Sequence, residues 1–421
     1  MKKIVVLGAG TAGTMVANHL THLLDLSQWQ ITIVDEDPIH YYQAGYIFVP
    51  FGQVDPNRLM KSKKNYLPSK VRMLQQKIDL IQPENNKVVL ADKTILDYDF
   101  LIIATGCDIY PEETPGLAED EWGKSIHSFY TLKSSVALAD KIKNFQGGRI
   151  VVNVVENPIK CPVAPMEFLM LSDAYFRKKG IRDRVELIYA TPNSGAFTKP
   201  VASKLIGDML DRKNIQVIPD FYIERADPDA KKIISYDEME VNYDLLVSIP
   251  LNKGADVIGK SGLGDDLNYV AVNTSTFLSK KFDNIFVLGD AANTPTSKAG
   301  SVAHYAVDLF GENFKRYIAG QEMEEIFDGH TNCFIESGDG RGVLLDFNYE
   351  QEPLPGRFPV PVIGPFALLQ ESKLNHIGKL SFEWMYWNIL MRGRKVPLAP
   401  TMTMAGKWTD WEKRFNISKA N

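Results

Sequence analysis

The chain has 421 residues, 45% of them hydrophobic and 24% charged, as is ordinary for a globular protein of two or three domains. Its net charge of −5 argues against nucleic-acid binding. Three cysteines are too few for a disulfide framework, so they indicate special thiols or buried small residues. No apolar run reaches the roughly 18 residues of a spanning helix. The N-terminal residues favour a first strand over a signal peptide, which predicts a cytoplasmic location by default.

A dinucleotide-binding fingerprint opens the chain. Residues 3–7 read as a buried strand, a glycine-rich turn follows, residues 14–24 have a helical pattern, and residues 30–34 form a second strand. The glycines permit a tight turn, close approach to a pyrophosphate and close helix–strand packing, and the helix start favours phosphate. The acid ending the second strand is placed to bind ribose hydroxyls. The cofactor residues predicted here are Gly8, Gly10, Ala12, Gly13, Asp35 and Glu36.

Two later segments favour FAD over NAD as the bound dinucleotide. The apolar strand 98–103 ends in Ala104, Thr105 and Gly106, and the strand 284–288 ends in Gly289 and Asp290. This order of segments resembles the flavoprotein family with two dinucleotide-binding domains, in which both segments flank FAD. The resemblance implies that Asp290 binds the ribityl chain and that Lys298 lies near the flavin ring.

A second Rossmann-like unit follows, but its nucleotide loop is unusual. Residues 150–155 read as a strand, 164–179 as a helix and 185–189 as another strand. The loop 156–162 between the first strand and the helix contains no glycine and two prolines. Without glycine the backbone cannot easily approach a pyrophosphate, and prolines remove N–H donors. We therefore expect the fold to be kept and the NAD site to be lost, with Cys161 as the new feature.

The run from Cys161 to Phe168, together with Gly289-Asp290 and the late pair Cys333-Phe334, resembles sulfide:quinone oxidoreductase over nearly the whole chain. It also resembles the flavoprotein subunit of flavocytochrome c sulfide dehydrogenase. The resemblance implies that Cys161 and Cys333 lie on one face of the flavin and cycle through a disulfide or sulfur-bridged form. The sequence leaves open whether the two are bridged at rest.

The resemblance also implies a mechanism and its accessory groups. HS⁻ attacks the bridge between the two cysteines, and two electrons pass to FAD and then to a quinone. Lys160, His330 and helix N-termini are the predicted sources of positive charge for the thiolates. Glu167 is a candidate acid or base, with a surface or capping role as the alternative, and Cys107 is a candidate third redox cysteine. The segment 40–46 has no cysteine, which predicts non-covalent FAD.

An aromatic, apolar stretch near the C-terminus, residues 379–391, is closed by a basic cluster. The residues that fall on one helical face are Phe382, Met385, Tyr386, Ile389 and Leu390. This pattern predicts either a core-facing helix or a monotopic membrane anchor, and a basic tail on an acidic body favours an anionic membrane surface. The resemblance places Phe334 at the quinone site, and Tyr386 is a weaker candidate for its opposite wall.

The sequence thus predicts an α/β protein with two Rossmann-like domains and a C-terminal membrane-facing helical region. The FAD domain comprises residues 1–110 and 270–320, the second unit 111–269 and the C-terminal region 321–421. The predicted function is sulfide:quinone oxidoreduction by a peripheral membrane flavoprotein, with no metal and no nucleic-acid partner; the membrane face and a homo-oligomer stay open. The alternatives are a flavocytochrome c-type subunit, a type II NADH:quinone dehydrogenase and a non-catalytic FAD-binding sulfur sensor.

Overall fold

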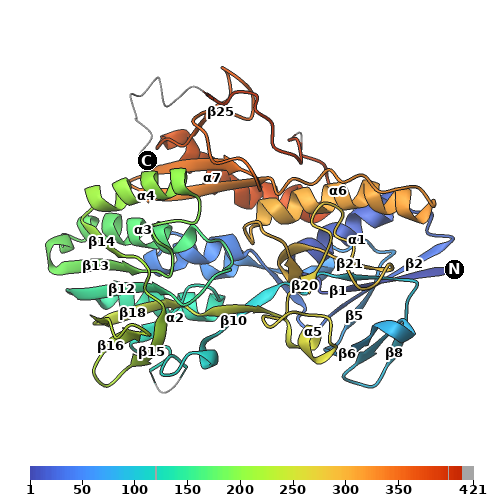
Figure 1. Cartoon of the computed structure of the whole chain (residues 1–421), viewed down its shortest axis with the longest axis horizontal. Helices are drawn as coiled ribbons and strands as arrows, with labels where there is room; N and C mark the ends of the chain where they lie inside the picture. Colours follow the sequence, from blue (N-terminus) through green and yellow to red (C-terminus); the bar gives the residue numbers. More distant parts are fainter. Residues whose placement is uncertain (119–120, 397, 410–421) are drawn as a thin grey trace.

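The structure, a computed structural model, describes residues 1–118, 121–396 and 398–409. Two five-stranded parallel sheets stand toward opposite ends of an elongated molecule (Figure 1). The N-terminal sheet has the order β21 (Ile285–Val287), β9 (Phe100–Ile103), β1 (Lys2–Leu7), β2 (Trp29–Asp35) and β5 (Arg72–Gln75). The second has the order β11 (Ile126–His127), β18 (Leu245–Ile249), β12 (Gly148–Val154), β13 (Val185–Ala190) and β14 (Ile215–Ile218). Together the two sheets confirm the predicted α/β class.

Helices cover both sheets because the central strands β1, β9, β12 and β18 are largely runs of buried Val, Ile and Leu, which must be shielded on both faces. The helices that pack with the N-terminal sheet are α1 (Thr11–Leu23), α6 (Gly300–Ile318) and the short α5 (Asp256–Lys260). Those of the second unit are α2 (Leu132–Asn144), α3 (Ala164–Lys178) and α4 (Pro200–Arg212). Every helix predicted from the sequence is therefore present, with ends shifted by a few residues.

The other strands of the two units form small sheets and ribbons. They comprise β6 (Ile78–Gln82), β7 (Lys87–Leu90) and β8 (Ile95–Asp97); β15 (Ile223–Asp227), β16 (Lys232–Ser235) and β17 (Glu240–Asn242); and the pairs β3 (Ile39–Tyr41) with β4 (Met60–Ser62), β10 (Cys107–Tyr110) with β19 (Leu251–Gly254), and β20 (Val270–Ala271) with β22 (Ala292–Asn293). The antiparallel pair of β10 and β19 carries the chain between the units. Beyond it, Ile258 and Leu263 pack with the core of the N-terminal sheet, although the sequence analysis assigns them to the second unit.

The C-terminal region differs from the helical region that the sequence predicts. It is built on a four-stranded sheet of order β23 (Thr331–Gly338), β24 (Arg341–Phe347), β26 (Phe366–Leu368) and β25 (Gly356–Phe358). One helix, α7 (Lys373–Asn388), covers this sheet and is followed by the short turn η8 (Leu390–Arg392). The sheet forms because β23 and β24 pair through the tight turn at 338–341, a strong local hairpin. The last part of the predicted basic tail, residues 410–421, lies outside the described residues.

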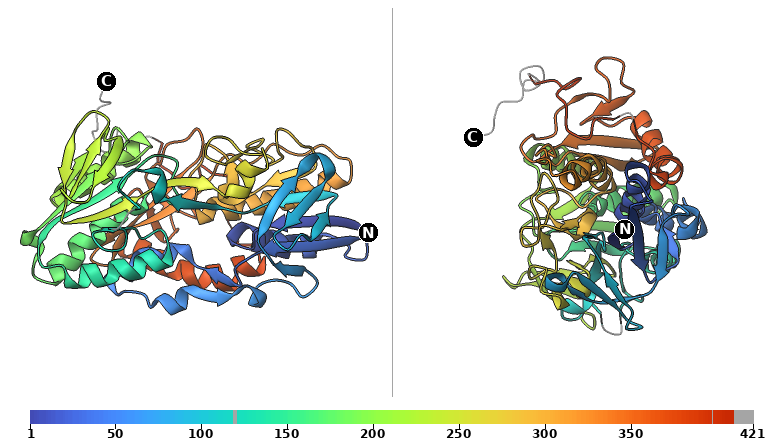
Figure 2. Two further views of the ribbon diagram at one scale, coloured as in Figure 1. Left: turned by 90° about the horizontal axis from the view of Figure 1, so that it is seen from below. Right: turned by 90° about the vertical axis from the view of Figure 1, so that its right-hand side faces the viewer.

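The predicted membrane face of α7 is the buried one. Tyr386 and Leu390 lie in the core with Trp387 and Met391, against α1 and the turn η1 (Gln43–Phe51). Figure 2 shows α7 and η1 side by side, and the rings of Tyr42 and Tyr386 are 4.9 Å apart. The opposite side of α7 is also apolar and exposed; its residues are Leu374, Ile377, Leu380 and Trp384. The core-facing alternative therefore describes Tyr386 and Leu390, while the other residues of the predicted face, Phe382, Met385 and Ile389, are half-buried.

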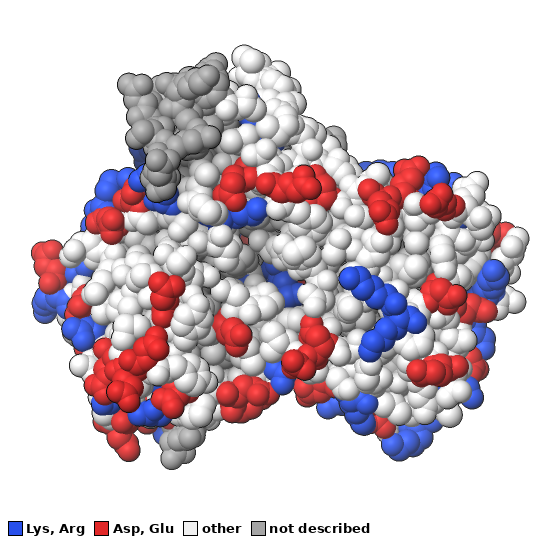
Figure 3. Space-filling view, in the orientation of Figure 1, with Lys and Arg blue, Asp and Glu red and all other residues white. Residues whose placement is uncertain are grey.

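The charge pattern of one broad face is uneven. In the orientation of Figure 1, acidic side chains gather over the small sheet of β15, β16 and β17, while both signs are interspersed elsewhere (Figure 3). The same face is hollowed near its centre, between the two ends of the molecule. Within the described residues, no helix is both long and apolar enough to cross a bilayer.

Candidate active site

A cavity of about 410 Å³ collects almost all of the predicted site residues. It is lined by the glycine turn after β1, the ends of β9 and β21, the loop before α3, the start of β23 and the inner side of α7. The predicted residues that line it are Gly8, Gly10, Ala12, Asp35, Ala104, Thr105, Gly106, Cys107, Cys161, Glu167, Gly289, Asp290, Lys298, Cys333, Phe334 and Tyr386. Of the others, Gly13 lies behind the turn and Glu36 is exposed.

The glycine turn has the shape that a dinucleotide requires. Gly8 has φ +92°, and a Cβ there would lie 2.4 Å from the carbonyl oxygen of Ala104. A Cβ at Gly13 would lie 1.9 Å from the carbonyl oxygen of Gly8, so only glycine lets α1 pack this closely. Gly10 instead faces open space, where a pyrophosphate would meet the start of α1.

Polar groups around the turn are also consistent with FAD. The carboxylate of Asp35 is held by the backbone N–H of Ala9 at 2.7 Å and by the ammonium of Lys63 at 2.7 Å. The buried hydroxyl of Thr105 has no partner within the described residues, so it is free to bind a ligand in the cavity. These residues fit the cofactor that the flavoprotein resemblance implies.

Lys298 and Asp290 form a rigid corner of this cavity. The ammonium of Lys298 donates to the carbonyl oxygens of Asp290 at 2.8 Å and of Ala292 at 3.2 Å, and it lies 3.8 Å from the ring centroid of Tyr269. Burial lowers the pKa of Lys298. The Lys298 side chain therefore holds the loop after β21 in place. Its own carbonyl oxygen accepts from the N–H of Cys161 at 2.8 Å, which ties the cysteine loop to that corner.

Cys161 lies where a nucleotide phosphate would lie in a working second Rossmann unit. It follows β12 and precedes α3, and its carbonyl oxygen accepts from the N–H of Ala164 at 2.9 Å. Its φ of +47° is a left-handed value that a non-glycine residue seldom adopts. The start of a helix is an electropositive place for a thiolate.

Cys333 reaches the same cavity from β23, which packs against α3. Both cysteines are free thiols in the structure and belong to the same core cluster. Burial first, and then the charge of Cys161, raises the pKa of the Cys333 thiol. Residues 172 positions apart in sequence thus line one cavity.

The cation that faces the thiols is Lys379 of α7, which the sequence analysis did not identify. Burial raises the pKa of the Cys161 thiol to about 11, while the ammonium of Lys379 opposes that rise. Lys379 donates to a Glu167 carboxylate oxygen at 2.7 Å and to the carbonyl oxygen of Phe334 at 2.9 Å. Although burial opposes it, the charges of Glu167 and Cys161 raise the pKa of Lys379, so the ammonium is retained.

Glu167 is buried rather than a surface or capping residue. It lies in the first turn of α3, and one of its oxygens accepts from Lys379 and from the N–H of Glu336 at 3.1 Å. The other oxygen is buried without a partner within the described residues. A buried carboxyl beside a lysine and a thiol is suited to proton transfer.

Two predicted sources of positive charge are paired with carboxylates, although one of them, Lys160, lines the cavity. The ammonium of Lys160 pairs with Asp108 at 3.7 Å, and the imidazole of His330 bonds Asp346 at 2.8 Å and stacks on Tyr305. His330 does not line the cavity, so proximity to Cys333 in sequence was misleading: side chains alternate along a strand. Lys379 had only a weak signal, a lysine within the aromatic helix α7.

Cys107 lies at the FAD side of the cavity, away from the pair. Its thiol is 3.9 Å from a carboxylate oxygen of Asp290. Burial, followed by the Asp290 charge, raises its pKa to about 12. Its role as a third redox cysteine stays a prediction, since burial raises the pKa of all three thiols.

The two candidate quinone residues, Phe334 and Tyr386, make different contacts in the cavity. Phe334 packs edge-on against Phe366, with ring centroids 5.3 Å apart, next to Lys379 at the α7 end of the cavity. Tyr386 instead bonds the Thr11 hydroxyl at 2.7 Å and the His40 imidazole at 2.6 Å. It therefore ties α7 to the fingerprint helix α1.

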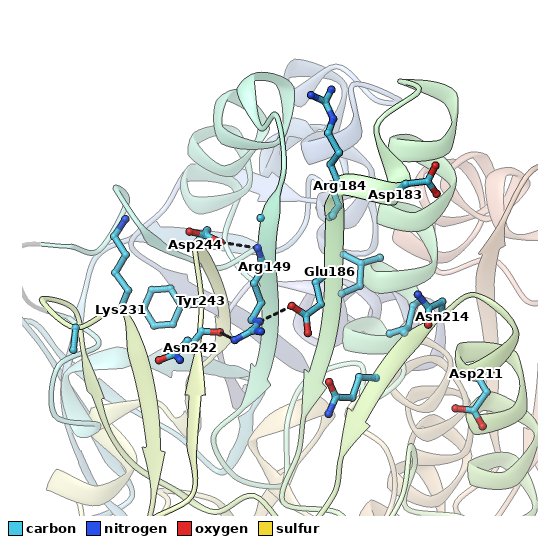
Figure 4. A pocket seen from close by; sticks show the side chains of 16 residues that line it. Arg149, Asp183, Arg184, Glu186, Asp211, Asn214, Lys231, Asn242, Tyr243 and Asp244 are labelled. Atoms are coloured by element: carbon cyan, nitrogen blue, oxygen red, sulfur yellow. Dashed lines mark hydrogen bonds and ion pairs between the residues drawn. The ribbon is translucent and has the colours of Figure 1, made fainter.

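A second, polar hollow of about 800 Å³ lies at the starts of β12, β13 and β14 (Figure 4). Parallel sheets bind ligands at the opposite, carboxyl ends of their strands. Its Arg149 is already engaged: the guanidinium pairs with Glu186 at 2.7 Å, and the backbone N–H bonds Asp244 (Figure 4). All three cysteines line the first cavity instead.

The glycine turn leads to a first prediction. Gly13→Ala would press a methyl group onto the Gly8 carbonyl oxygen, so we expect the purified variant to contain less than about a tenth of the wild-type FAD per chain. The measurement is the ratio of flavin to protein absorbance. Gly207→Ala in α4 is the control, since a Cβ there meets no atom within 4 Å; it should keep full FAD. Full FAD content in Gly13→Ala would contradict this account of the turn.

Comparisons with known proteins show similarity to sulfide:quinone oxidoreductases in sequence and in fold. Residues 2–153 match the family model for pyridine nucleotide-disulphide oxidoreductases. The chain is 28% identical to the mitochondrial sulfide:quinone oxidoreductase of Dictyostelium discoideum, covering 93% of this chain and 86% of that protein. It is 25% identical to the mouse (Mus musculus) protein of the same name, with the same coverage. The crystal structure of the sulfide:quinone oxidoreductase from Aquifex aeolicus has a TM-score of 0.78 and 19% identity, covering 100% of this chain and 96% of that one.

Proposed function

We propose that this chain, which belongs with the sulfide:quinone oxidoreductases, uses FAD to oxidise sulfide to zero-valent sulfur and to reduce a quinone. The observation that carries the proposal is the position of Cys161. It occupies the start of α3, in the glycine-free loop where NAD phosphates would bind, and it shares one cavity with Cys333 and the FAD segments. Sulfur chemistry takes the place of a nicotinamide site.

The residues can be assigned roles in this reaction. FAD, when bound between the glycine turn, residues 104–106 and Asp290, supplies the two-electron chemistry. HS⁻ attacks a sulfur of a Cys161–Cys333 bridge, which leaves a persulfide on one cysteine and a thiolate on the other. The start of α3 and the ammonium of Lys379 stabilise the thiolate, and Glu167 holds Lys379 in place.

The alternatives make different demands on the site. A type II NADH dehydrogenase needs a backbone that approaches the NADH pyrophosphate, and the loop 156–162 has no glycine to allow it. A flavocytochrome c-type subunit passes electrons to a cytochrome rather than to a quinone. A sulfur sensor would bind FAD without turning over quinone.

A steady-state assay separates these functions. Purified protein with a short-chain, water-soluble ubiquinone analogue should reduce the quinone when sulfide is added and not when NADH is added. Quinone reduction by NADH alone would contradict the proposal and restore the dehydrogenase. Flavin reduction by sulfide without quinone reduction would also contradict it, in favour of a cytochrome partner or a sensor.

We propose that the exposed side of α7 rests on a membrane surface. The apolar residues on this side recur every three or four positions, and Trp384 and Ile377 are 65% and 54% exposed. Val362 and Ile363, in the loop before β26, are more exposed still. The basic residues Lys373, Arg392 and Arg394 flank the helix, as expected for contact with anionic headgroups. Because a quinone is insoluble in water, its reductase must reach lipid.

This surface gives a second prediction. The double variant Ile377→Ser/Trp384→Ser should bind anionic phospholipid vesicles at least about tenfold more weakly in a flotation assay, since burial of these side chains in lipid contributes roughly 1.5–3 kcal/mol each. Its reduction of the soluble quinone analogue should stay close to wild type. Tyr236→Ser/Tyr222→Ser, which alters two exposed aromatics of the second unit, is the control. Unchanged flotation of the α7 variant would overturn the proposed surface.

A further inference from the structure

The proposed reaction requires a proton from solvent. Oxidation of HS⁻ to zero-valent sulfur releases two electrons and one proton, and reduction of a quinone to a quinol takes up two electrons and two protons. Each turnover therefore consumes one net proton. The proton released by HS⁻ accompanies the electrons in the first half-reaction, so the net uptake falls in the second, when the quinone is reduced.

The cavity is connected to the surface by a line of titratable groups that begins at Lys379 and Glu167. The Lys379 ammonium and a Glu167 carboxylate oxygen form an ion pair at 2.7 Å, at the Phe334 end of the cavity. The next group is Glu336, three residues after Cys333 on β23, whose backbone N–H donates to Glu167 at 3.1 Å. The Glu336 side chain is only 2% exposed.

The line reaches solvent at His376. A carboxyl oxygen of Glu336 and the Nδ1 atom of His376 share a hydrogen bond of 2.7 Å. The His376 side chain is 26% exposed, so it can exchange protons with water. His376 and Lys379 are on successive turns of α7 and present their polar ends to the same pair of carboxyl groups.

Two unpartnered oxygens indicate that a proton resides in this line. One carboxyl oxygen of Glu167 and one of Glu336 are buried and have no partner within the described residues. Burial first, then the charge of Glu167, raise the pKa of Glu336, while His376 and Lys379 oppose the rise. Burial and the neighbouring charge thus favour the protonated form of Glu336, which can pass a proton through this layer.

We propose that Glu336 and His376 form the path by which protons enter from solvent to Glu167 and Lys379 for the reduction of the quinone. The inference rests on the proposed function. His376 exchanges protons with water, Glu336 carries them through the buried layer between β23 and α7, and Glu167 and Lys379 deliver them at the cavity. Neither Glu336 nor His376 lines the cavity, so both act through other residues.

The two half-reactions test this path separately. Under anaerobic conditions, sulfide should bleach the flavin band of Glu336→Gln and His376→Ala at close to the wild-type rate. Return of the band on adding the soluble quinone should be about tenfold slower or more in both variants. Imidazole in the medium should speed the return several-fold in His376→Ala only, because Glu336→Gln lacks the next link of the path.

Controls distinguish a proton path from a structural ion pair. Glu383→Gln makes the same change on α7 at a carboxylate that pairs with Arg58 at the surface, 3.2 Å away, and should not slow either phase. A wild-type rate of return in both variants, or a slow return in His376→Ala that imidazole does not speed, would overturn the path. Failure of sulfide to bleach the wild type would instead refute the proposed function itself.

Discussion

Cys161→Ala should lower the rate at which sulfide bleaches the flavin by about 10³-fold or more, because the variant lacks the sulfur that the proposed mechanism attacks or liberates. Cys333→Ala should lose a similar factor. The double variant should be no slower than either single one, since residues that act as a unit give non-additive losses. Stopped-flow absorbance under anaerobic conditions measures all three rates.

FAD content provides the control for the cysteine series. Neither cysteine belongs to the glycine turn or to residues 104–106, so each variant should keep one FAD per chain. Bleaching of Cys161→Ala within tenfold of the wild-type rate would show that the cysteine pair is not the sulfide site. A double variant much slower than both single ones would contradict the paired action of the two thiols.

Lys379→Met should destabilise the protein strongly, because it leaves the buried carboxylate of Glu167 without its cation. Breaking a buried pair by removing one partner costs about 3–5 kcal/mol in the free energy of unfolding. The double variant Lys379→Met/Glu167→Gln should recover part of that loss, since the remaining side chain carries no charge. Urea denaturation of the wild type and the variants gives the values.

The same substitution should move the pH dependence of bleaching. Lys379 holds the pKa of Cys161 below the value that burial alone would produce, so its loss raises that pKa further. Less thiolate is then present at any given pH, and the rising limb of the rate profile should shift to higher pH. Lys395→Met, which removes the lysine of an exposed pair with Glu312, should alter neither stability nor profile appreciably. An unshifted profile in Lys379→Met would contradict its assigned role.

Local patterns were enough to predict the two parallel sheets and the FAD segments. The run of buried Val and Ile in β1, the glycines at 8, 10 and 13 and the strand ends at 104 and 289 each carry their signal within a few residues. The absence of glycine from the loop 156–162 is equally local. It located Cys161 correctly at the start of a helix.

What the sequence could not predict depends on contacts between distant segments. Lys379 and Glu167 are far apart in the chain, and no periodicity links a lysine of α7 to a carboxyl of α3. The orientation of α7 was equally undetermined, because both of its faces are apolar. It was decided by the contact of the Tyr42 and Trp387 rings and by the bond from Tyr386 to Thr11, which join α7 to the residue before η1 and to α1.

The most direct test of the proposed function is one anaerobic titration of the wild-type flavin. We expect stoichiometric sulfide to bleach the flavin band, NADH to leave it unchanged, and a soluble quinone to restore it fully after sulfide. Those results would assign both substrates to the one cavity that contains Cys161 and Cys333. Bleaching by NADH but not by sulfide would contradict the account and identify the chain as a dehydrogenase despite its glycine-free loop.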